Sequence, residues 1–244
     1  MTSPVETHYR TLLASRYTWM YGGLEKCLSA ARELLDSLGL LASSHGVVLD
    51  LGSGPGYHAK ALAESGSRVI AVDNSPELLQ ELAQVCSGLD VVPLQAEISD
   101  TARYAVRSPF SAILCLGDTL THLDSFATVE RLIDEWSRML ASGGALALEF
   151  REQARDLYGQ DAVLTTRADR DRIMQCVLHF EPERVWITDI VHEWNGSQWQ
   201  VWKSTYPKLR LKAEWIVARA AAAGLVVKSD AVRAGRRVMA LTRG

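Results

Sequence analysis

The chain has 244 residues, of which 48% are hydrophobic and 23% charged, and its net charge is -3. This length suits one α/β domain with a full hydrophobic core. The weak negative charge provides no basic field to gather nucleic acid, so a small-molecule partner is favoured over a polymer.

The cysteines and the amino terminus allow predictions of the cellular compartment and of metal binding. Cys27, Cys86, Cys115 and Cys176 are far apart and lack metal-ligand spacing. They are typical of reduced thiols in a cytoplasmic protein, and no metal is expected. The first ten residues do not resemble a signal peptide, and no stretch reaches the ~18 apolar residues that span a bilayer, so no membrane association is expected.

The first predicted elements are helical. Residues 8–41 carry apolar and aromatic side chains at helical spacing, interrupted by Gly22 and Gly23. The pattern predicts two helices with a break between them, the second closed by Gly39.

From residue 47 the pattern alternates between strands and helices. Helices are predicted at about 56–65, after the capping residue Ser75, and from near Asp124. The predicted strands are "VVLDL" (47–51), "RVIAVD" (68–73), "DVVPLQA" (90–96), "SAILCLG" (111–117) and "GALALEF" (144–150). This alternation predicts a parallel sheet covered on both faces, with ligands bound at the carboxyl ends of its strands.

After residue 160 strands follow one another without helices. They are predicted at 162–166, 173–180, 184–194 and 199–206, and Asn195-Gly196 is a strong signal for a two-residue hairpin turn. We expect an antiparallel meander, followed by a helix at 211–224 and a terminal hairpin with a short Ala-Gly turn.

The turn after the first strand carries an acid and three glycines, Asp50, Gly52, Gly54 and Gly56. Glycines allow the backbone to turn sharply and to approach a ligand closely. The fixed charge of Asp50 favours a cationic ammonium or sulfonium ligand over a pyrophosphate at this turn.

A nicotinamide dinucleotide is the alternative ligand. Gly54-x-Gly56-x-x-Ala59 satisfies a dinucleotide-binding pattern, and Asp73 follows Gly54 by 19 residues. The acid at Asp50 and the terminal hairpin both argue against this alternative, since a parallel dinucleotide-binding fold has neither.

Five motifs in order resemble the class I S-adenosylmethionine-dependent methyltransferases: "VLDLGSGPG", "VIAVDNS", "LQAEISD", "AILCLGDTLTHL" and "LASGGALALEF". The resemblance covers nearly the whole chain. It implies a seven-stranded Rossmann-like sheet with a C-terminal antiparallel hairpin, an N-terminal helical lid and an inserted β-meander. The expected single domain divides into the lid (1–45), a cofactor-binding core (46–160), the insert (161–207) and a C-terminal helix and hairpin (208–244).

The same resemblance implies where S-adenosyl-L-methionine and its product S-adenosyl-L-homocysteine bind. The glycine turn would pass under the methionine portion, with Asp50 ordering the turn and the ammonium group. Asp73 would bind the ribose hydroxyls, although an acidic cap of the next helix is the alternative for this residue. The implied cofactor set is Asp50, Gly52, Gly54, Gly56, Asp73, Asn74, Glu97, Ile98, Leu116, Gly117, Tyr17, Trp19 and Tyr21, with Gln95 or Asp100 as alternatives to Glu97 and with Tyr9 as a further aromatic candidate.

The acceptor region resembles the glycine N-methyltransferase-like branch, in which the N-terminal helices and the insert close over the cofactor. His122 is the predicted catalytic base, because its ordinary pKa near ~6.5 suits that role, with a packed turn residue as the alternative. Asp118 is the second catalytic candidate. Thr119, Arg151, Tyr206 and Arg210 are predicted to contact the acceptor, and Lys208 lies in the same charged strand end.

Five of the seven tryptophans lie between residues 186 and 215. They predict either a hydrophobic face of the meander or an aromatic acceptor pocket, and the sequence leaves both open.

The predicted function is methyl transfer to a small molecule, at nitrogen rather than oxygen. The glycine-type insert and the lack of a catechol-type metal-binding carboxylate set favour nitrogen. Alternatives are O-methylation, a cofactor-binding regulatory protein without turnover, and an NAD-dependent oxidoreductase. Nucleic acid is not an expected partner, because "GDTL" (117–120) stands where base-modifying relatives carry an N-P-P-Y-type tetrapeptide. A monomer and a homodimer both fit the sequence.

Overall fold

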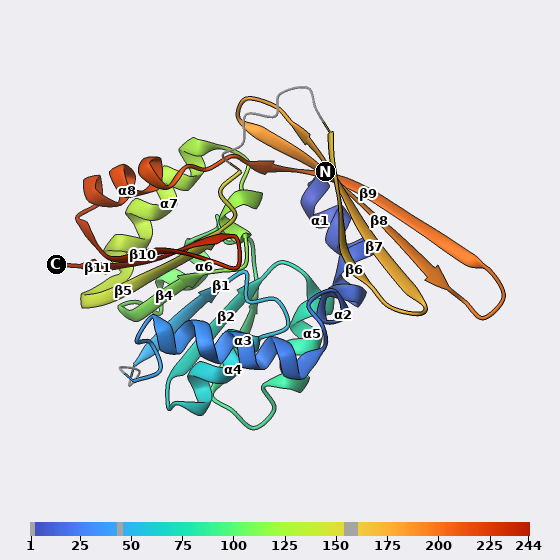
Figure 1. The fold of residues 1–244 in the computed structure, drawn as a ribbon. Coiled ribbons are helices and arrows are strands. Elements are labelled where there is room, and N and C mark those ends of the chain that lie inside the picture. The colour runs from blue at the N-terminus through green and yellow to red at the C-terminus, as the bar shows by residue number, and fades with distance from the viewer. Residues whose placement is uncertain (1–2, 43–45, 154–160) are drawn as a thin grey trace.

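A seven-stranded sheet forms the centre of the computed structural model, which describes residues 3–42, 46–153 and 161–244 (Figure 1). The strand order is β10-β11-β5-β4-β1-β2-β3, and all neighbours run parallel except β11, which is antiparallel to both β5 and β10. Its strands are β1 (Val47–Leu51), β2 (Arg68–Asp73), β3 (Val91–Gln95), β4 (Phe110–Cys115), β5 (Leu140–Phe150), β10 (Leu225–Arg233) and β11 (Arg236–Arg243). The predicted fold class, with its C-terminal antiparallel hairpin, is confirmed.

Helices cover both faces of this sheet. One face packs against α3 (Leu24–Ser37), α4 (Tyr57–Glu64) and α5 (Pro76–Val85), and the other against α6 (Ala102–Ala105), α7 (Phe126–Met139) and α8 (Ala213–Ala222). Leu49 and Leu114 on the central strands are fully buried, as expected for parallel strands between two helical layers. The hydroxyl of Ser75 caps α5 by accepting the Leu78 N–H, and Ser125 caps α7 in the same way.

The insert is a separate antiparallel sheet, β6-β7-β8-β9, which extends away from the core (Figure 1). Its strands are β6 (Asp161–Ala168), β7 (Arg172–Phe180), β8 (Arg184–Trp194) and β9 (Trp199–Leu209). The turn between β8 and β9 has four residues, 195–198, rather than the predicted two. The reason is that the Asn195 side chain accepts the N–H groups of Ser197 and Gln198 and so builds a longer turn.

The N-terminal region divides into two parts with different neighbours. Short helical pieces, α1 (Pro4–His8), a π-type turn (Tyr9–Leu13), a 3₁₀ turn (Ala14–Arg16) and α2 (Tyr17–Met20), replace the first predicted helix. They pack on the insert, where Leu12 and Leu13 contact Met174 and Val191. In contrast, α3 packs on α4 and joins the core through Leu35. We therefore restrict the name "lid segment" to residues 4–21.

The predicted boundaries shift slightly. The insert ends at Leu209 rather than at 207, because β9 continues its pairing with β8. The predicted border between core and insert at 160 falls in 154–160, outside the described residues. The β10–β11 turn has the predicted Ala-Gly pair, and both Ala234 (φ 47°) and Gly235 (φ 76°) have the left-handed conformation of a tight hairpin turn.

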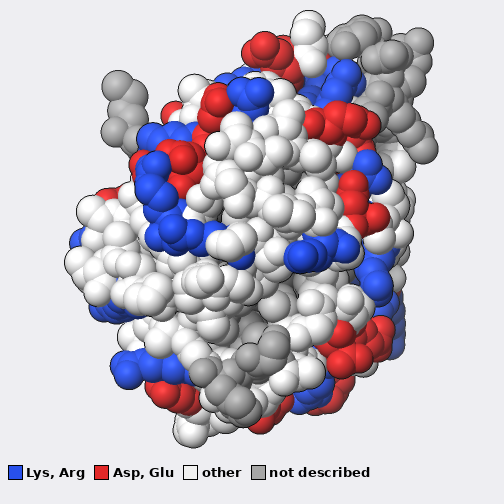
Figure 2. Space-filling model, turned by 90° about the vertical axis from the view of Figure 1, so that its left-hand side faces the viewer, with Lys and Arg blue, Asp and Glu red and all other residues white. Residues whose placement is uncertain are grey.

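The surface of the core carries both signs of charge. Figure 2 shows the face at the left of Figure 1, on which basic and acidic side chains are interspersed around an uncharged centre. Over residues 3–42, 46–153 and 161–244, we find no helix with the length and apolar character that crossing a bilayer requires.

Gly56 begins α4 and provides a test of the packing at the glycine turn. Its φ is +85°, and an added Cβ would lie 2.6 Å from Leu82 Cγ and 3.1 Å from Cys86 Sγ. Gly88 (φ +79°) has the same backbone conformation, but an added Cβ there would meet nothing within 4 Å. We expect Gly88→Ala to lower the free energy of unfolding by about 1 kcal/mol and Gly56→Ala by about 3 kcal/mol, measured by urea denaturation. Equal losses would contradict the packing described here.

Candidate active site

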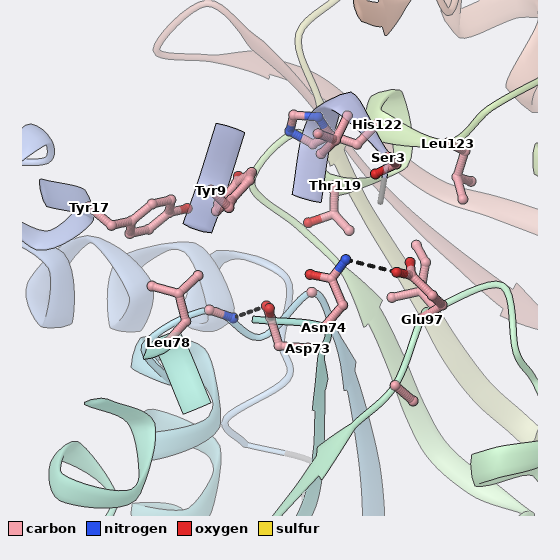
Figure 3. Close-up of a pocket in the computed structure, with 15 residues that line it drawn as sticks. Ser3, Tyr9, Tyr17, Asp73, Asn74, Leu78, Glu97, Thr119, His122 and Leu123 are labelled. Carbon is pink, nitrogen blue, oxygen red and sulfur yellow. Dashed lines mark hydrogen bonds between the residues drawn. The ribbon is translucent and has the colours of Figure 1, made fainter. Parts of the chain in front are cut away.

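A pocket opens at the carboxyl ends of β1, β2 and β4, beneath the lid segment (Figure 3). It encloses about 700 Å³ of space, including its open mouth. This is the edge of the sheet at which the sequence predicted a ligand. Nine of the predicted site residues line it: Tyr17, Gly52, Gly54, Asp73, Asn74, Glu97, Ile98, Thr119 and His122.

Asp73 is held in place by backbone donors from two turns. Its Oδ2 accepts the N–H of Gly54 at 2.8 Å, and its Oδ1 accepts the N–H of Ser75 at 2.9 Å. Burial raises the pKa of Asp73, and these two hydrogen bonds oppose the rise. The cap of α5 is the Ser75 hydroxyl rather than Asp73, so the carboxylate keeps lone pairs free for a ligand.

Glu97 and Asn74 form the side of the pocket next to β3. The Asn74 side-chain amide donates to Glu97 Oε1 at 3.0 Å, and both residues line the pocket together with the nearly buried Ile98 (Figure 3). The alternatives Gln95 and Asp100 do not line it. An acid beside an apolar side chain can accept hydrogen bonds from one edge of a heteroaromatic ring while the apolar side chain covers the face of that ring.

Asp50 lies behind the glycine turn rather than on the pocket wall. It is 1% exposed, accepts the backbone N–H of Ala59 in the first turn of α4, and its Oδ2 has no hydrogen-bond partner among the described residues. Burial, and then the charge of Asp73, raise the pKa of Asp50 to about 7. The position accounts for the predicted ordering of the turn. Gly56 also faces away from the pocket, toward Leu82.

The lid segment contributes Tyr9 and Tyr17, whose rings extend into the pocket in Figure 3. Tyr17 lies across the glycine turn: a Cβ built on Gly54 would be 4.0 Å from its ring, and one built on Gly117 would be 3.9 Å from its hydroxyl. Gly117 and the buried Leu116 therefore lie just behind Tyr17, at the end of β4.

Trp19, predicted for the cofactor site, lies outside the pocket wall in this structure. The indole N–H donates to Asp169 at 2.5 Å, and the guanidinium of Arg172 lies 5.4 Å from the ring centre. Trp19 thus fixes the lid segment to the insert and does not line the pocket. The reason is that the short helical pieces turn Trp19 toward the insert while Tyr17 faces the pocket.

His122 sits among aromatic rings at the top of the pocket. Its ring centre is 5.8 Å from that of Tyr9 and 5.6 Å from that of Tyr206, and its buried Nδ1 has no hydrogen-bond partner among the described residues. Burial, and then the nearby ammonium of Lys208, lower the pKa of His122 well below its usual value. The imidazole is therefore neutral at physiological pH and able to accept a hydrogen bond, whereas the lowered pKa makes it a weaker proton acceptor than the predicted catalytic base.

Asp118, the second catalytic candidate, lies outside the pocket wall and is paired with basic side chains. Its carboxylate is 3.2 Å from Lys208 Nζ and 4.0 Å from both Arg151 and Arg236, and its φ of 73° is left-handed. Burial acts to raise the pKa of Asp118, but Lys208 and then Arg236 outweigh it and hold this pKa well below its usual range. A carboxylate so strongly paired remains ionised and takes up no proton near pH 7.

Three predicted acceptor contacts lie outside the pocket wall. Arg210 is buried and donates to the carbonyls of Gln153 and Glu181, so it ties the insert to the core. Tyr206 is buried behind His122, stacked on His8 at 4.1 Å. Arg151 has a half-exposed side chain beyond the pocket.

The tryptophans of the insert do not line the pocket either. Trp194, Trp199 and Trp202 are 40–46% exposed, and Trp194 contacts Trp199 with ring centres 5.7 Å apart. Of the two interpretations of the tryptophan-rich insert, these positions favour the structural one.

Sequence reasoning missed part of the site. Ser3, Val5, Leu78, Ala96 and Leu123 complete the pocket wall. No motif contains Ser3, Val5 or Leu78, whereas Ala96 and Leu123 lie inside two of the five motifs but were not predicted as site residues. Glu149 was also missed, although its Oε2 accepts the N–H of Gly117 at 2.9 Å. An acid at the end of a hydrophobic strand is the signal that could have found it. In the described ranges, no group of three or more His, Cys, Asp or Glu side chains is placed to hold a metal ion.

Comparisons with known proteins agree with this geometry. A family model described as a methyltransferase domain matches residues 48–144. A glycine/sarcosine N-methyltransferase from Parasynechococcus marenigrum is 31% identical over 50% of this chain and 45% of its own length. A ubiquinone biosynthesis O-methyltransferase from Xylella fastidiosa is 33% identical over 52% of each chain. The match thus spans about half the length of these curated relatives.

Among solved structures, the chain is similar to the amino pentose methyltransferase CalS10 from Micromonospora echinaspora, solved with S-adenosylmethionine bound. The TM-score is 0.76 at 19% identity, over 93% of this chain and 94% of that one. Residues 48–144 thus match a methyltransferase domain, and over most of the chain the fold is similar to that of an S-adenosylmethionine-dependent methyltransferase.

The buried carboxyl of Asp50 generates a pH-dependent prediction. Because its pKa is raised from 3.8 to about 7, the folded state holds a proton that the unfolded state has lost, and stability falls as the pH rises through this window. An asparagine side chain at this position would keep the shape without the charge. We expect the stability advantage of Asp50→Asn over the wild type to be small near pH 4 and to be larger at pH 8 than at pH 5 by roughly 1–3 kcal/mol, measured by urea denaturation. A difference that is the same at pH 5 and at pH 8 would contradict this account of Asp50.

Proposed function

We propose that the protein transfers a methyl group from S-adenosyl-L-methionine to a small-molecule amine. The observation that carries the proposal is the pocket in which the Gly54 N–H fixes Asp73 beside the glycine turn. Asp73 and Glu97 are the only residues of the described pocket wall with a formal charge, since His122 is neutral. A site with acidic and no basic groups favours a cationic sulfonium and ammonium ligand over the pyrophosphate of NAD.

The residues present fit this cofactor. Asp73 would accept hydrogen bonds from the ribose hydroxyls, and Glu97, Asn74 and Ile98 would surround the adenine. The glycine turn leaves room for the methionine portion at Gly54, where an added Cβ would meet only the Tyr17 ring, at 4.0 Å. Tyr17 would cover that portion from the lid side.

The chemistry depends on orientation and on the proton state of the acceptor. Bound S-adenosyl-L-methionine supplies an electrophilic methyl group on a sulfonium. An acceptor amine must be neutral to attack in line, and neutral His122 would accept a hydrogen bond from its N–H and so orient its lone pair toward the methyl group. Tyr9, Tyr17 and the rest of the lid segment would exclude water from the reacting atoms.

Nitrogen is the better supported acceptor atom. The relatives named as an N-methyltransferase and an amino pentose methyltransferase support it, and so does the neutral histidine over the pocket. The relative named as an O-methyltransferase keeps a hydroxyl acceptor as the alternative. A regulatory protein that binds the cofactor without turnover is the alternative from another class.

A direct test follows transfer of a labelled methyl group from S-adenosyl-L-methionine. We expect label in low-molecular-weight amines and not in the matching compounds with a hydroxyl in place of the amine. Label found only in the hydroxyl compounds would overturn the nitrogen assignment. Cofactor binding without transfer to either series would favour the regulatory alternative.

Asp73 is expected to dominate cofactor affinity. Asp73→Asn should weaken S-adenosyl-L-homocysteine binding about 10- to 100-fold, because it removes a charged acceptor from a buried site. Asp100→Asn is the matched control, since Asp100 is exposed and does not line the pocket. Isothermal titration calorimetry measures both. Equal effects of the two substitutions would contradict the role of Asp73.

His122 is expected to act on turnover and not on cofactor binding. His122→Asn should lower kcat about 100-fold if the imidazole orients the acceptor amine, while the dissociation constant of S-adenosyl-L-homocysteine stays within about twofold. Steady-state kinetics and calorimetry on the same preparation measure the two effects. An unchanged kcat would leave His122 as a packing residue.

A further inference from the structure

We propose that Arg236 is a positioning residue that latches the lid segment over the cofactor pocket, acting through Tyr21 and Tyr17. No motif marks Arg236, which lies far along the chain from the glycine turn. The proposal builds on the cofactor site proposed above only where it predicts ligand affinity, because the latch itself is a contact within the free protein.

Arg236 contacts the lid segment and the core at once. Its Nη2 donates to the Tyr21 hydroxyl at 2.9 Å, and its guanidinium carbon lies 5.6 Å from the centre of the Tyr21 ring. On the core side, Nη1 is 3.5 Å from Glu149 Oε2 and Nη2 is 4.0 Å from Asp118 Oδ2. The side chain of Arg236 is 16% exposed, so these contacts form largely out of water.

The local fold fixes the position of Arg236. It is the first residue of β11, directly after the tight Ala234-Gly235 turn, and it pairs with Arg233 across the hairpin. Glu149 and Asp118 are 8% and 5% exposed. Since a buried charge without a partner is costly, the two carboxylates hold the guanidinium in place.

Tyr21 connects this cation to the pocket. Its ring centre is 5.1 Å from that of Tyr17, which lies across Gly54 with its hydroxyl beside Gly117. Glu149, the carboxylate that pairs with Arg236, also accepts the Gly117 N–H. One cation therefore positions both the tyrosine above the pocket and the turn at the end of β4 beneath it.

Other contacts hold the lid segment to different parts of the molecule. Arg16 pairs with Glu193 and Trp19 donates to Asp169, both in the insert sheet or its turns. Thr18 shares a 2.6 Å hydrogen bond with the hydroxyl of Tyr57 on α4. The Arg236–Tyr21 contact is distinct because it joins the lid segment to the C-terminal hairpin, directly behind Tyr17. Loss of this contact should loosen the residues around Tyr17 without releasing the whole segment.

The test compares four variants with the wild type. Tyr21→Phe removes only the hydroxyl and leaves the pairs of Arg236 with Glu149 and Asp118, so it should fold normally. Arg236→Gln removes the cation, and Arg236→Lys restores charge without the forked donors. Arg233→Gln is the matched control, because Arg233 is an exposed arginine in the same hairpin. Each variant is measured by hydrogen exchange of peptides from 4–21 and by S-adenosyl-L-homocysteine binding.

We expect Tyr21→Phe and Arg236→Gln to speed amide exchange around residues 17–21 and to weaken S-adenosyl-L-homocysteine binding by about five- to twentyfold, with partial recovery in Arg236→Lys. Arg233→Gln should change neither quantity. In steady-state kinetics of Tyr21→Phe and Arg236→Gln, KM for the cofactor should rise by a larger factor than kcat falls, because the latch acts on the cofactor pocket and not on the reacting atoms.

Two results would overturn the latch. The first is Tyr21→Phe with lid exchange and ligand affinity like those of the wild type. The second is a lower Tm of Arg236→Gln with amide exchange in residues 17–21 as slow as in the wild type, which would make Arg236 a structural residue of the hairpin. A wild-type protein that binds no S-adenosyl-L-homocysteine would remove the proposed function, but the exchange measurement would still decide the latch.

Discussion

The hydrogen bond from the Gly54 N–H to Asp73 is the contact on which the site depends. It joins the turn after β1 to the end of β2, so the glycine turn and the acid at the neighbouring strand keep a fixed spacing. Parallel pairing of β1 with β2 brings the two ends together, and the Ser75 N–H fixes the other carboxylate oxygen. This one contact therefore holds the acidic Asp73 rigidly beside the glycine turn, whose glycines carry no side chains. The lid segment covers both.

Charge in the site is arranged in two layers. The pocket wall carries acids and a neutral histidine, which suits a cation and an amine. The basic residues Lys208, Arg236 and Arg151 lie behind that wall, where Asp118 and Glu149 compensate them. Asp118 therefore joins the hairpin to the insert, and Arg236 extends this contact to the lid segment through Tyr21. Neutral His122 is left as a hydrogen-bond acceptor on the pocket wall. Asp50 is buried with its Oδ2 unpaired among the described residues, and burial raises its pKa to about 7.

The sequence predicted what depends on local spacing. The periodicity of apolar residues predicted the order of strands and helices. The sequence separation between Gly54 and Asp73 is that of one strand-helix-strand unit, so both residues could be predicted. Arg236 and Glu149 were missed because their contact depends on the register between β11 and β5. Asp118, Arg210 and Trp19 were predicted for the site but lie outside the pocket wall, because each is held by partners far along the sequence. Such partners are set by tertiary packing, which no motif records.

The most direct test of the account is thermal unfolding with S-adenosyl-L-homocysteine, with NAD as the control ligand. Ligand at about 100 times its dissociation constant stabilises the folded state by roughly 2.7 kcal/mol. For a domain of this size, that corresponds to a Tm higher by about 5 to 10 °C. A rise with S-adenosyl-L-homocysteine and none with NAD is the predicted result. A rise with NAD alone, or with neither compound, would contradict the assignment of the glycine turn and Asp73 to a sulfonium cofactor.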